Sequence, residues 1–238
     1  EIPYRDDLWW TFLTDSQASG FLRAAVVLSL LTLVVAFRSL LTAPGARQHG
    51  PATPADIARA RKALEQAEVA SPEARLALLG DKALLFSPSG DSFLAYRVRG
   101  RRWIAMSEPA GLIGERLELL WSFAEMADNY GGSPVFYSVS ETVLADLATL
   151  GLAVRKVGEA AVVPTHSFST EGKGKQNLRT AINRAEREGS QFSVLPVGEA
   201  MSIADELRAV SEAWINHHEG TEKEFSLGRF DIGYLNEC

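Results

Sequence analysis

The sequence predicts an α+β protein that opens with one long apolar helix, continues into a mixed domain and then begins a second α/β unit. Three observations support this prediction. Residues 21–43 are apolar almost throughout. From residue 81 onward the hydrophobic period changes from that of helices to that of short strands separated by turns. Residues 166–238 then give the order helix, strand, helix, helix, which is expected at the start of a further unit.

Length, charge and cysteine content narrow the classes of function. The chain has 238 residues, 46% of them hydrophobic, which is enough for one or two domains with their own cores. Its formal net charge of −6 excludes binding of polyanions through overall charge, so such binding must use local basic patches. Cys238 is the only cysteine, which excludes a disulfide framework. The chain begins without Met and stops within what reads as a helix, so we expect a fragment.

Residues 21–43 are predicted to form a transmembrane helix. The uninterrupted apolar part is shorter than the ~20 residues of a usual span, but Arg23 and Arg38 can reach toward the interface and lengthen it. Two adjacent tryptophans mark residues 1–20 as an interfacial segment, and the basic residues after the helix place the later chain in the cytoplasm. The alternatives are a buried helix and a signal peptide. They are disfavoured because the helix is apolar on all faces and follows an acidic segment.

Residues 44–53 read as a linker and residues 54–165 as the first folded domain. Thr53 before Pro54 is a typical helix start. Two helices, three strands in a meander, a helix, a strand and another helix are expected in that order. Two further strands are predicted at residues 152–158 and 160–164. The order indicates a largely antiparallel sheet with helices packed on it.

A basic, amphipathic helix over residues 173–189 is the strongest candidate binding element. Its spacing places apolar side chains on one face and cations on the other, and Gly189 is suited to end it. The cations are Lys173, Lys175, Arg179, Arg184 and Arg187. Such a face could bind the phosphates of a nucleic acid or a lipid, or it could simply be the solvated side of a packed helix.

A strand over residues 192–197 and a long helix over residues 198–218 follow. The helix ends in two histidines, which point to different faces, so no metal site is expected. His217 beside Glu222 could act as a general base, and a polar helix end is the alternative interpretation. Phe225 and Phe230 are expected to be packing residues that could line a groove.

Gly111 and Gly114 lie between a strand and a helix, where free N–H groups could hold a phosphate. Glutamates flank both glycines and would repel an anion, which favours an ordinary turn.

Five runs of the sequence carry a resemblance to a known family. They are DLWWTF, LLGDKALLFSPSGDSFLAY, PVFYSVS, KQNLRTAINRAEREG and FSLGRFD. In these runs, and in their order and spacing, the chain resembles the bacterial phosphatidylglycerol lysyltransferases, the multiple peptide resistance factor family of aminoacyl-phosphatidylglycerol synthases. The resemblance implies an integral membrane enzyme whose cytoplasmic part has two tandem GNAT-like halves. Residues 54–165 would be the first half and residues 166–238 the incomplete start of the second.

The resemblance also implies a reaction and its partners. The family transfers an aminoacyl group, usually lysyl, from aminoacyl-tRNA to phosphatidylglycerol in the bacterial cell membrane, which gives resistance to cationic antimicrobial peptides. Aminoacyl-tRNA is the donor, so no further cofactor is implied. The full-length protein would be multi-pass and could be a homo-oligomer. Its main catalytic groups are expected beyond residue 238, so the fragment alone is expected to be inactive.

Within this chain, the resemblance implies substrate contacts rather than catalytic groups. As a hypothesis, tRNA phosphates or anionic lipid headgroups are faced by Lys175, Arg179, Arg184 and Arg187, and a substrate groove is lined by His217, Glu222, Phe225 and Phe230. Two alternatives stay open at this point. One is a non-catalytic, membrane-tethered module that binds anionic lipid, and the other is a cell-wall aminoacyl-tRNA-dependent transferase of the same fold.

Overall fold

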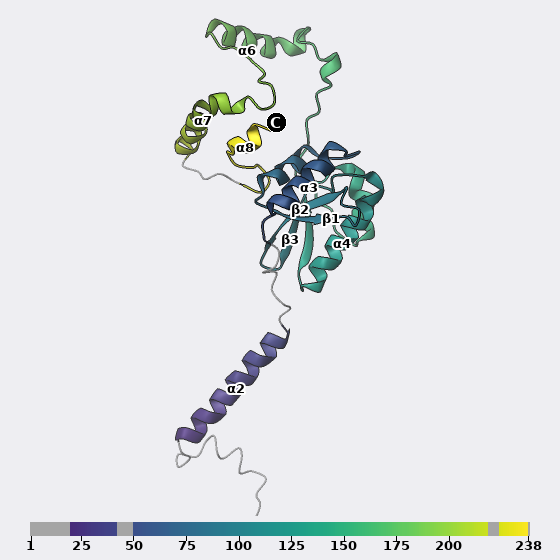
Figure 1. Cartoon of the computed structure of the whole chain (residues 1–238), viewed down its shortest axis with the longest axis vertical. Helices are drawn as coiled ribbons and strands as arrows, with labels where there is room; N and C mark the ends of the chain where they lie inside the picture. Colours follow the sequence, from purple (N-terminus) through teal and green to yellow (C-terminus); the bar gives the residue numbers. More distant parts are fainter. Residues whose placement is uncertain (1–19, 42–49, 219–223, 238) are drawn as a thin grey trace, which may run out of the picture.

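A computed structural model describes residues 20–41, 50–218 and 224–237 (Figure 1). Its architecture is α+β with one four-stranded sheet, so that part of the fold prediction is confirmed. The predicted interfacial segment and linker fall mostly outside the described residues, and so does Glu222. The division into domains at residues 54–165 and 166–238 stays a prediction.

The sheet has the strand order β1-β2-β3-β4. Its strands are β1 (Ala83–Phe86), β2 (Phe93–Arg99), β3 (Arg102–Met106) and β4 (Ser133–Tyr137). The first three strands pair antiparallel, as the predicted meander requires, with Tyr96 opposite both Ala83 and Ala105. β4 runs parallel to β3, because the chain crosses over through helix α4 (Arg116–Asn129) between the two strands.

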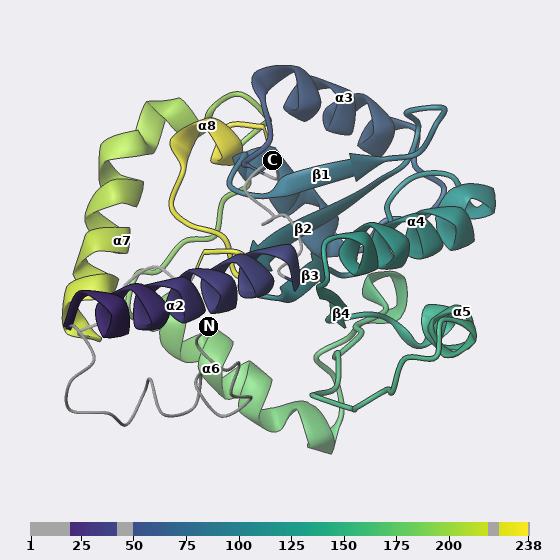
Figure 2. The same ribbon diagram turned by 90° about the horizontal axis from the view of Figure 1, so that it is seen from below.

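Helices cover both faces of this sheet, and the strands alternate to match (Figure 2). On β2, Phe93 and Ala95 pack against α3 (Pro54–Glu65) and the 3-10 helix η1 (Pro72–Leu79). The next side chains, Leu94 and Tyr96, pack on the opposite face with Phe123 of α4. This period of two is the pattern of a strand that is buried on both sides.

Shorter helices complete the described part of the domain. They are η2 (Ile113–Glu115), η3 (Glu141–Val143) and α5 (Leu144–Thr149). Leu120 of α4 packs with Val143 and Leu147 in a small separate cluster. The predicted start of α3 is confirmed. Thr53 and Asp56 form a reciprocal capping box, and proline occupies the first turn.

The apolar segment near the start of the chain forms α2 (Gly20–Leu41), but the prediction of a transmembrane helix over residues 21–43 is wrong. Among the residues described, no helix combines the length and the apolar character that a membrane crossing requires. The physical reason lies in the two arginines. Arg23 and Arg38 bound an apolar stretch that is shorter than the ~20 residues of a span.

Three predicted strands are also absent from the described residues. The chain over residues 152–158, 160–164 and 192–197 has no regular strand structure. Most of its apolar side chains are exposed, with 87% of Val162 and 92% of Phe192 accessible to solvent. A run of apolar residues becomes a strand only when a neighbouring strand pairs with it, and β4 is the last paired strand of the sheet.

The later part of the chain extends away from the sheet and then returns to it (Figure 1). Its elements are η4 (Thr165–Ser167), η5 (Lys173–Lys175), α6 (Gln176–Arg187), η6 (Ala200–Ile203), α7 (Ala204–His217) and α8 (Ile232–Leu235). Neither α6 nor α7 buries a residue. The return is made by residues 224–237, and Arg61 of α3 holds Glu237 there through an ion pair of 2.7 Å.

Candidate functional site

The predicted basic helix is present as η5 followed by α6. Its end is a Schellman motif, in which Gly189 has φ 79°. The N–H of Gly189 donates to the carbonyl of Glu186, and the N–H of Ser190 donates to the carbonyl of Ala185. The apolar face is half covered, since Leu178 and Ile182 each keep 45% of their surface exposed. The helix is therefore regular and amphipathic, and it stands off the sheet.

The four cations of this helix that were predicted to contact substrate have different surroundings. Arg179 donates hydrogen bonds to the carbonyls of Thr170 and Gly172, so it fastens the preceding loop to the helix. Arg184 pairs with Glu188 at 2.7 Å on an exposed surface. The Nε of Arg187 donates to its own helix. These contacts indicate that Arg179 is structural, whereas the guanidinium groups of Arg184 and Arg187 lie at the exposed end of α6.

Lys175, the fourth cation, lies at a hollow in front of α6. Its Nζ is 4.4 Å from the centroid of the Phe168 ring, which is a cation–π contact. The hollow has a volume of about 410 Å³ and is lined by residues 162–164, 167–169 and Lys175.

His217 is the last residue of α7. Its ring meets that of His218 edge to face at 5.0 Å, and His218 stacks on Trp214 at 4.5 Å. The carbonyl of Trp214 lies 2.8 Å from Nδ1 of His218. The role of His217 as a base stays a prediction, because Glu222 lies outside the described residues.

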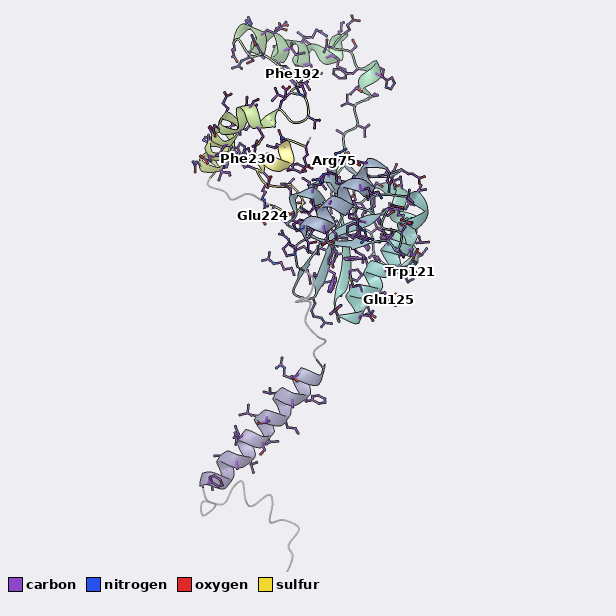
Figure 3. The ribbon with its side chains drawn as sticks, viewed as in Figure 1. Arg75, Trp121, Glu125, Phe192, Glu224 and Phe230 are labelled. Atoms are coloured by element: carbon purple, nitrogen blue, oxygen red, sulfur yellow. The ribbon has the colours of Figure 1, made fainter. Side chains whose placement is uncertain are left out.

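Phe225 and Phe230, which were predicted to line a groove, lie in the returning segment next to cations. Figure 3 labels Phe230 there. The Phe225 ring is 6.0 Å from the Nζ of Lys82 and 5.7 Å from the guanidinium of Arg97. The Phe230 ring is 5.6 Å from the guanidinium of Arg208 on α7. The structure therefore separates them from α6, and the predicted site residues that it describes do not converge on one site (Figure 1).

A buried ion pair lies beneath Phe225, and sequence reasoning missed it. Lys82 is fully buried, and its Nζ donates to Asp81 Oδ1 at 2.6 Å and to the carbonyl of Leu76 at 3.1 Å. Arg97 contacts the other oxygen of Asp81 at 2.9 Å and Glu224 at 3.5 Å. Burial lowers the pKa of Lys82, and Asp81 partly opposes this shift. The only signal in the sequence was a lysine directly before an apolar strand.

The returning segment is seated closely on this ion pair. Glu224 and Phe225 have φ values of 35° and 45°, which non-glycine residues rarely adopt. Gly228 also has positive φ, and a Cβ there would lie 3.1 Å from a methyl group of Leu76. We call residues 224–237, with Asp81, Lys82 and Arg97 beneath them, the seam.

Of the two glycines considered for phosphate binding, Gly111 has structural partners, whereas a Cβ at Gly114 would meet nothing within 4 Å among the described residues. Gly111 exchanges backbone hydrogen bonds with Val69. Its Cα approaches Ser92 so closely that no side chain could be accommodated. Ser92 in turn donates to Glu115, which the hydrogen bonds of nearby serines hold at a lowered pKa. The ordinary-turn interpretation is therefore the better one.

Comparison with known proteins gives one consistent family. The family model described as "Phosphatidylglycerol lysyltransferase, C-terminal" matches residues 61–238. The phosphatidylglycerol lysyltransferase of Bacillus subtilis (strain 168) is 33% identical over 163 residues, and that of Staphylococcus xylosus is 30% identical over 159 residues. These stretches cover 68% and 67% of this chain, but the chain spans only 19% of either relative.

Solved structures agree with that family. The chain is similar to a C-terminal domain from Agrobacterium fabrum whose name assigns it to the lysylphosphatidylglycerol synthetases. The TM-score is 0.71 and the identity 37%, over 76% of this chain and 57% of that one. It is also similar to L-PGS from Bacillus licheniformis, with a TM-score of 0.66 and 28% identity over 79% of this chain and 58% of that one.

Proposed function

The chain belongs to the phosphatidylglycerol lysyltransferase family, and we propose that it forms part of an enzyme that transfers a lysyl group from aminoacyl-tRNA to phosphatidylglycerol. The observation that carries the proposal is the family match over residues 61–238. The names of the relatives favour this function over a cell-wall transferase. The enzyme would work at the bacterial cell membrane, where phosphatidylglycerol is found, and the added positive charge would weaken the attraction of cationic antimicrobial peptides.

The proposed reaction is an acyl transfer between two oxygen atoms. The glycerol hydroxyl of the lipid attacks the ester carbonyl, the bond to the ribose oxygen of the tRNA breaks, and the hydroxyl proton passes to that oxygen. Such a transfer needs a proton acceptor and donors for the developing oxyanion. The ester is already activated, so we propose no further cofactor. Because the chain spans 19% of its curated relatives, we assign its residues to binding and support, and we place the catalytic groups elsewhere in the enzyme.

We assign tRNA contact to the exposed end of α6. Arg184 and Arg187 lie one turn apart there, and the Arg184 side chain is 73% exposed. They have no aromatic partner in the described contacts, so they would bind phosphate rather than stack on bases. Arg179 is left out of this surface because it holds the carbonyls of Thr170 and Gly172.

Charge reversal tests this assignment. The double variant Arg184→Glu and Arg187→Glu should weaken binding of lysyl-tRNA and reduce the slope of log affinity against log salt by roughly one unit per lost phosphate contact. Arg155→Glu is the matched control, since Arg155 is also exposed but lies outside α6. Equal weakening by the control would show a general charge effect and remove the assignment.

A further inference from the structure

The hollow in front of α6 combines an apolar wall with a single cation. Val162 and Val163, which keep 87% and 57% of their surface exposed, are among the residues that line it. Lys175 and Phe168 also line it, and Ser167 and Ser169 add hydroxyl groups. We call this hollow, of about 410 Å³, the Lys175 pocket.

Lys175 is positioned but its charge is not neutralised by an ion pair. The Phe168 ring holds the ammonium at 4.4 Å, which fixes its place at the pocket. Among residues 50–218 and 224–237, no carboxylate lies within ion-pairing distance of Lys175. An ammonium has three N–H donors, and a ring face does not satisfy them all. The pocket thus offers a directed cation to an anionic ligand.

A hydroxyl group in the lining of the same pocket can support the anion. Ser169 Oγ accepts the N–H of Glu171 at 3.1 Å, which leaves its own O–H available for donation. The two valines that line the pocket have no polar atoms in their side chains, so they suit the apolar part of a ligand. A sugar–phosphate backbone would leave this apolar wall without a complementary group, whereas an amphiphile would cover it.

From these features we infer that the Lys175 pocket binds an anionic phospholipid. The phosphate would lie against Lys175 and Ser169, and the first carbons of the acyl chains would lie against Val162 and Val163. A volume of about 410 Å³ fits a headgroup and the start of the chains rather than a whole lipid. The identification of that lipid as phosphatidylglycerol rests on the proposed function. The two ends of the basic helix would then serve different ligands, with lipid at Lys175 and tRNA at Arg184 and Arg187.

The test uses soluble, monomeric lipids, because the exposed apolar side chains of α2 would attach to any vesicle. Dihexanoyl phosphatidylglycerol is titrated into the whole chain by calorimetry, below its micelle concentration. Dihexanoyl phosphatidylcholine, which has acyl chains but no net charge, and glycerol 3-phosphate, which has charge but no acyl chains, serve as the two comparison ligands. We expect phosphatidylglycerol to bind at least about tenfold more tightly than either, because phosphatidylcholine lacks the net negative charge and glycerol 3-phosphate lacks the acyl chains.

Matched variants locate the binding. Lys175→Gln should weaken it about tenfold, while Lys173→Gln, two residues away and outside the pocket, should change it less than about twofold. Val163→Ser should weaken phosphatidylglycerol but not glycerol 3-phosphate, and circular dichroism checks that each variant is folded. Equal losses at the two lysines, equal affinity for the two lipids, or equal affinity for glycerol 3-phosphate would each overturn the inference. A loss of tRNA binding in Lys175→Gln that is as large as the loss of lipid binding would also overturn it.

The outcomes also separate this inference from the proposed function. Lipid binding at the pocket without any lysyl transfer by the complete enzyme would contradict the function and leave the pocket standing. Lysyl transfer that is unchanged in Lys175→Gln, together with no binding by the chain, would contradict the pocket and leave the function standing.

Discussion

The Nζ of Lys82 lies 2.6 Å from Oδ1 of Asp81, and the two side chains are only 0% and 7% exposed. Two charges at this depth are stable only while each retains its partner. Arg97, which contacts the second oxygen of Asp81, makes the arrangement asymmetric. Asp81 has two cationic partners, whereas Asp81 is the only carboxylate within ion-pairing distance of Lys82 among the described residues.

That asymmetry predicts unequal effects of substitution. Asp81→Ala leaves a buried ammonium without a carboxylate and should lower the free energy of unfolding by about 3–5 kcal/mol. Lys82→Met leaves Asp81 paired with Arg97 and should cost about 1 kcal/mol. Urea denaturation of both variants measures the difference. A larger loss for Lys82→Met than for Asp81→Ala would contradict this account of the seam.

Tyr96 should make the protein less stable in alkali. Burial among Trp103 and Phe123 raises the pKa of Tyr96 to about 12. The unfolded chain ionises its tyrosines near pH 10, so the stability from neutral Tyr96 is complete below about pH 10 and declines as the pH rises toward 12. Tyr96→Phe should reduce this decline, and Tyr137→Phe, at an exposed position, should retain it. An identical dependence of stability on pH in the two variants would contradict the assignment of the alkaline decline to Tyr96.

The capping box at Thr53 predicts a contrast between two helix starts. Thr53→Ala removes the acceptor for the N–H of Asp56 and should cost about 1 kcal/mol. Ser71→Ala is the control, because the Ser71 side chain makes no capping hydrogen bond at the start of η1 and its buried Oγ has no hydrogen-bond partner among the described residues. It should be neutral or slightly stabilising. Thermal unfolding of both variants measures this difference in stability.

The same box gives a prediction in acid. Hydrogen bonds from Thr53 lower the pKa of Asp56 below its usual value near 4. The stability that these bonds provide is present above about pH 4 and is lost as the pH falls through the lowered pKa. Asp56→Asn should therefore flatten the acid limb of the stability curve, and an unchanged limb would show that the carboxylate does not contribute.

A substitution at Gly228 tests whether close packing holds residues 224–237 in place. Its φ of 73° is close to the 72° of Gly151, so Ala at either site has a similar backbone cost of about 1–2 kcal/mol. At Gly228 the new methyl group would also press on Leu76 and Leu79, whereas at Gly151 it would meet nothing within 4 Å. Hydrogen exchange should therefore accelerate over residues 224–237 in Gly228→Ala alone. The same acceleration in Gly151→Ala would show that packing at Gly228 is unimportant.

Local signals in the sequence were sufficient for the helices and the meander. The cap at Thr53, the basic face of α6 and its end at Gly189 each depend on residues within a few positions of one another. The strands predicted at residues 152–158, 160–164 and 192–197 do not form. A strand needs a neighbouring strand to pair with, and the hydrophobic pattern does not show whether one is present. The transmembrane prediction was wrong because it assumed that two arginines could lengthen an apolar stretch that is too short for a span.

The site was less predictable for a similar reason. The pair Asp81 and Lys82 looks like a polar turn in the sequence, and only the return of residues 224–237 shows that it is covered. The different surroundings of Lys175 and Arg179 likewise depend on the path of residues 162–172, which no periodicity encodes.

The central claim is lysyl transfer to phosphatidylglycerol, and lipid analysis tests it most directly. Lipids are extracted from cells that express the gene encoding this chain, and from cells with an empty vector, and both are analysed by mass spectrometry. The account predicts lysyl-phosphatidylglycerol in the first sample and none in the second. The absence of any aminoacylated phosphatidylglycerol, in cells that make the protein, would contradict it.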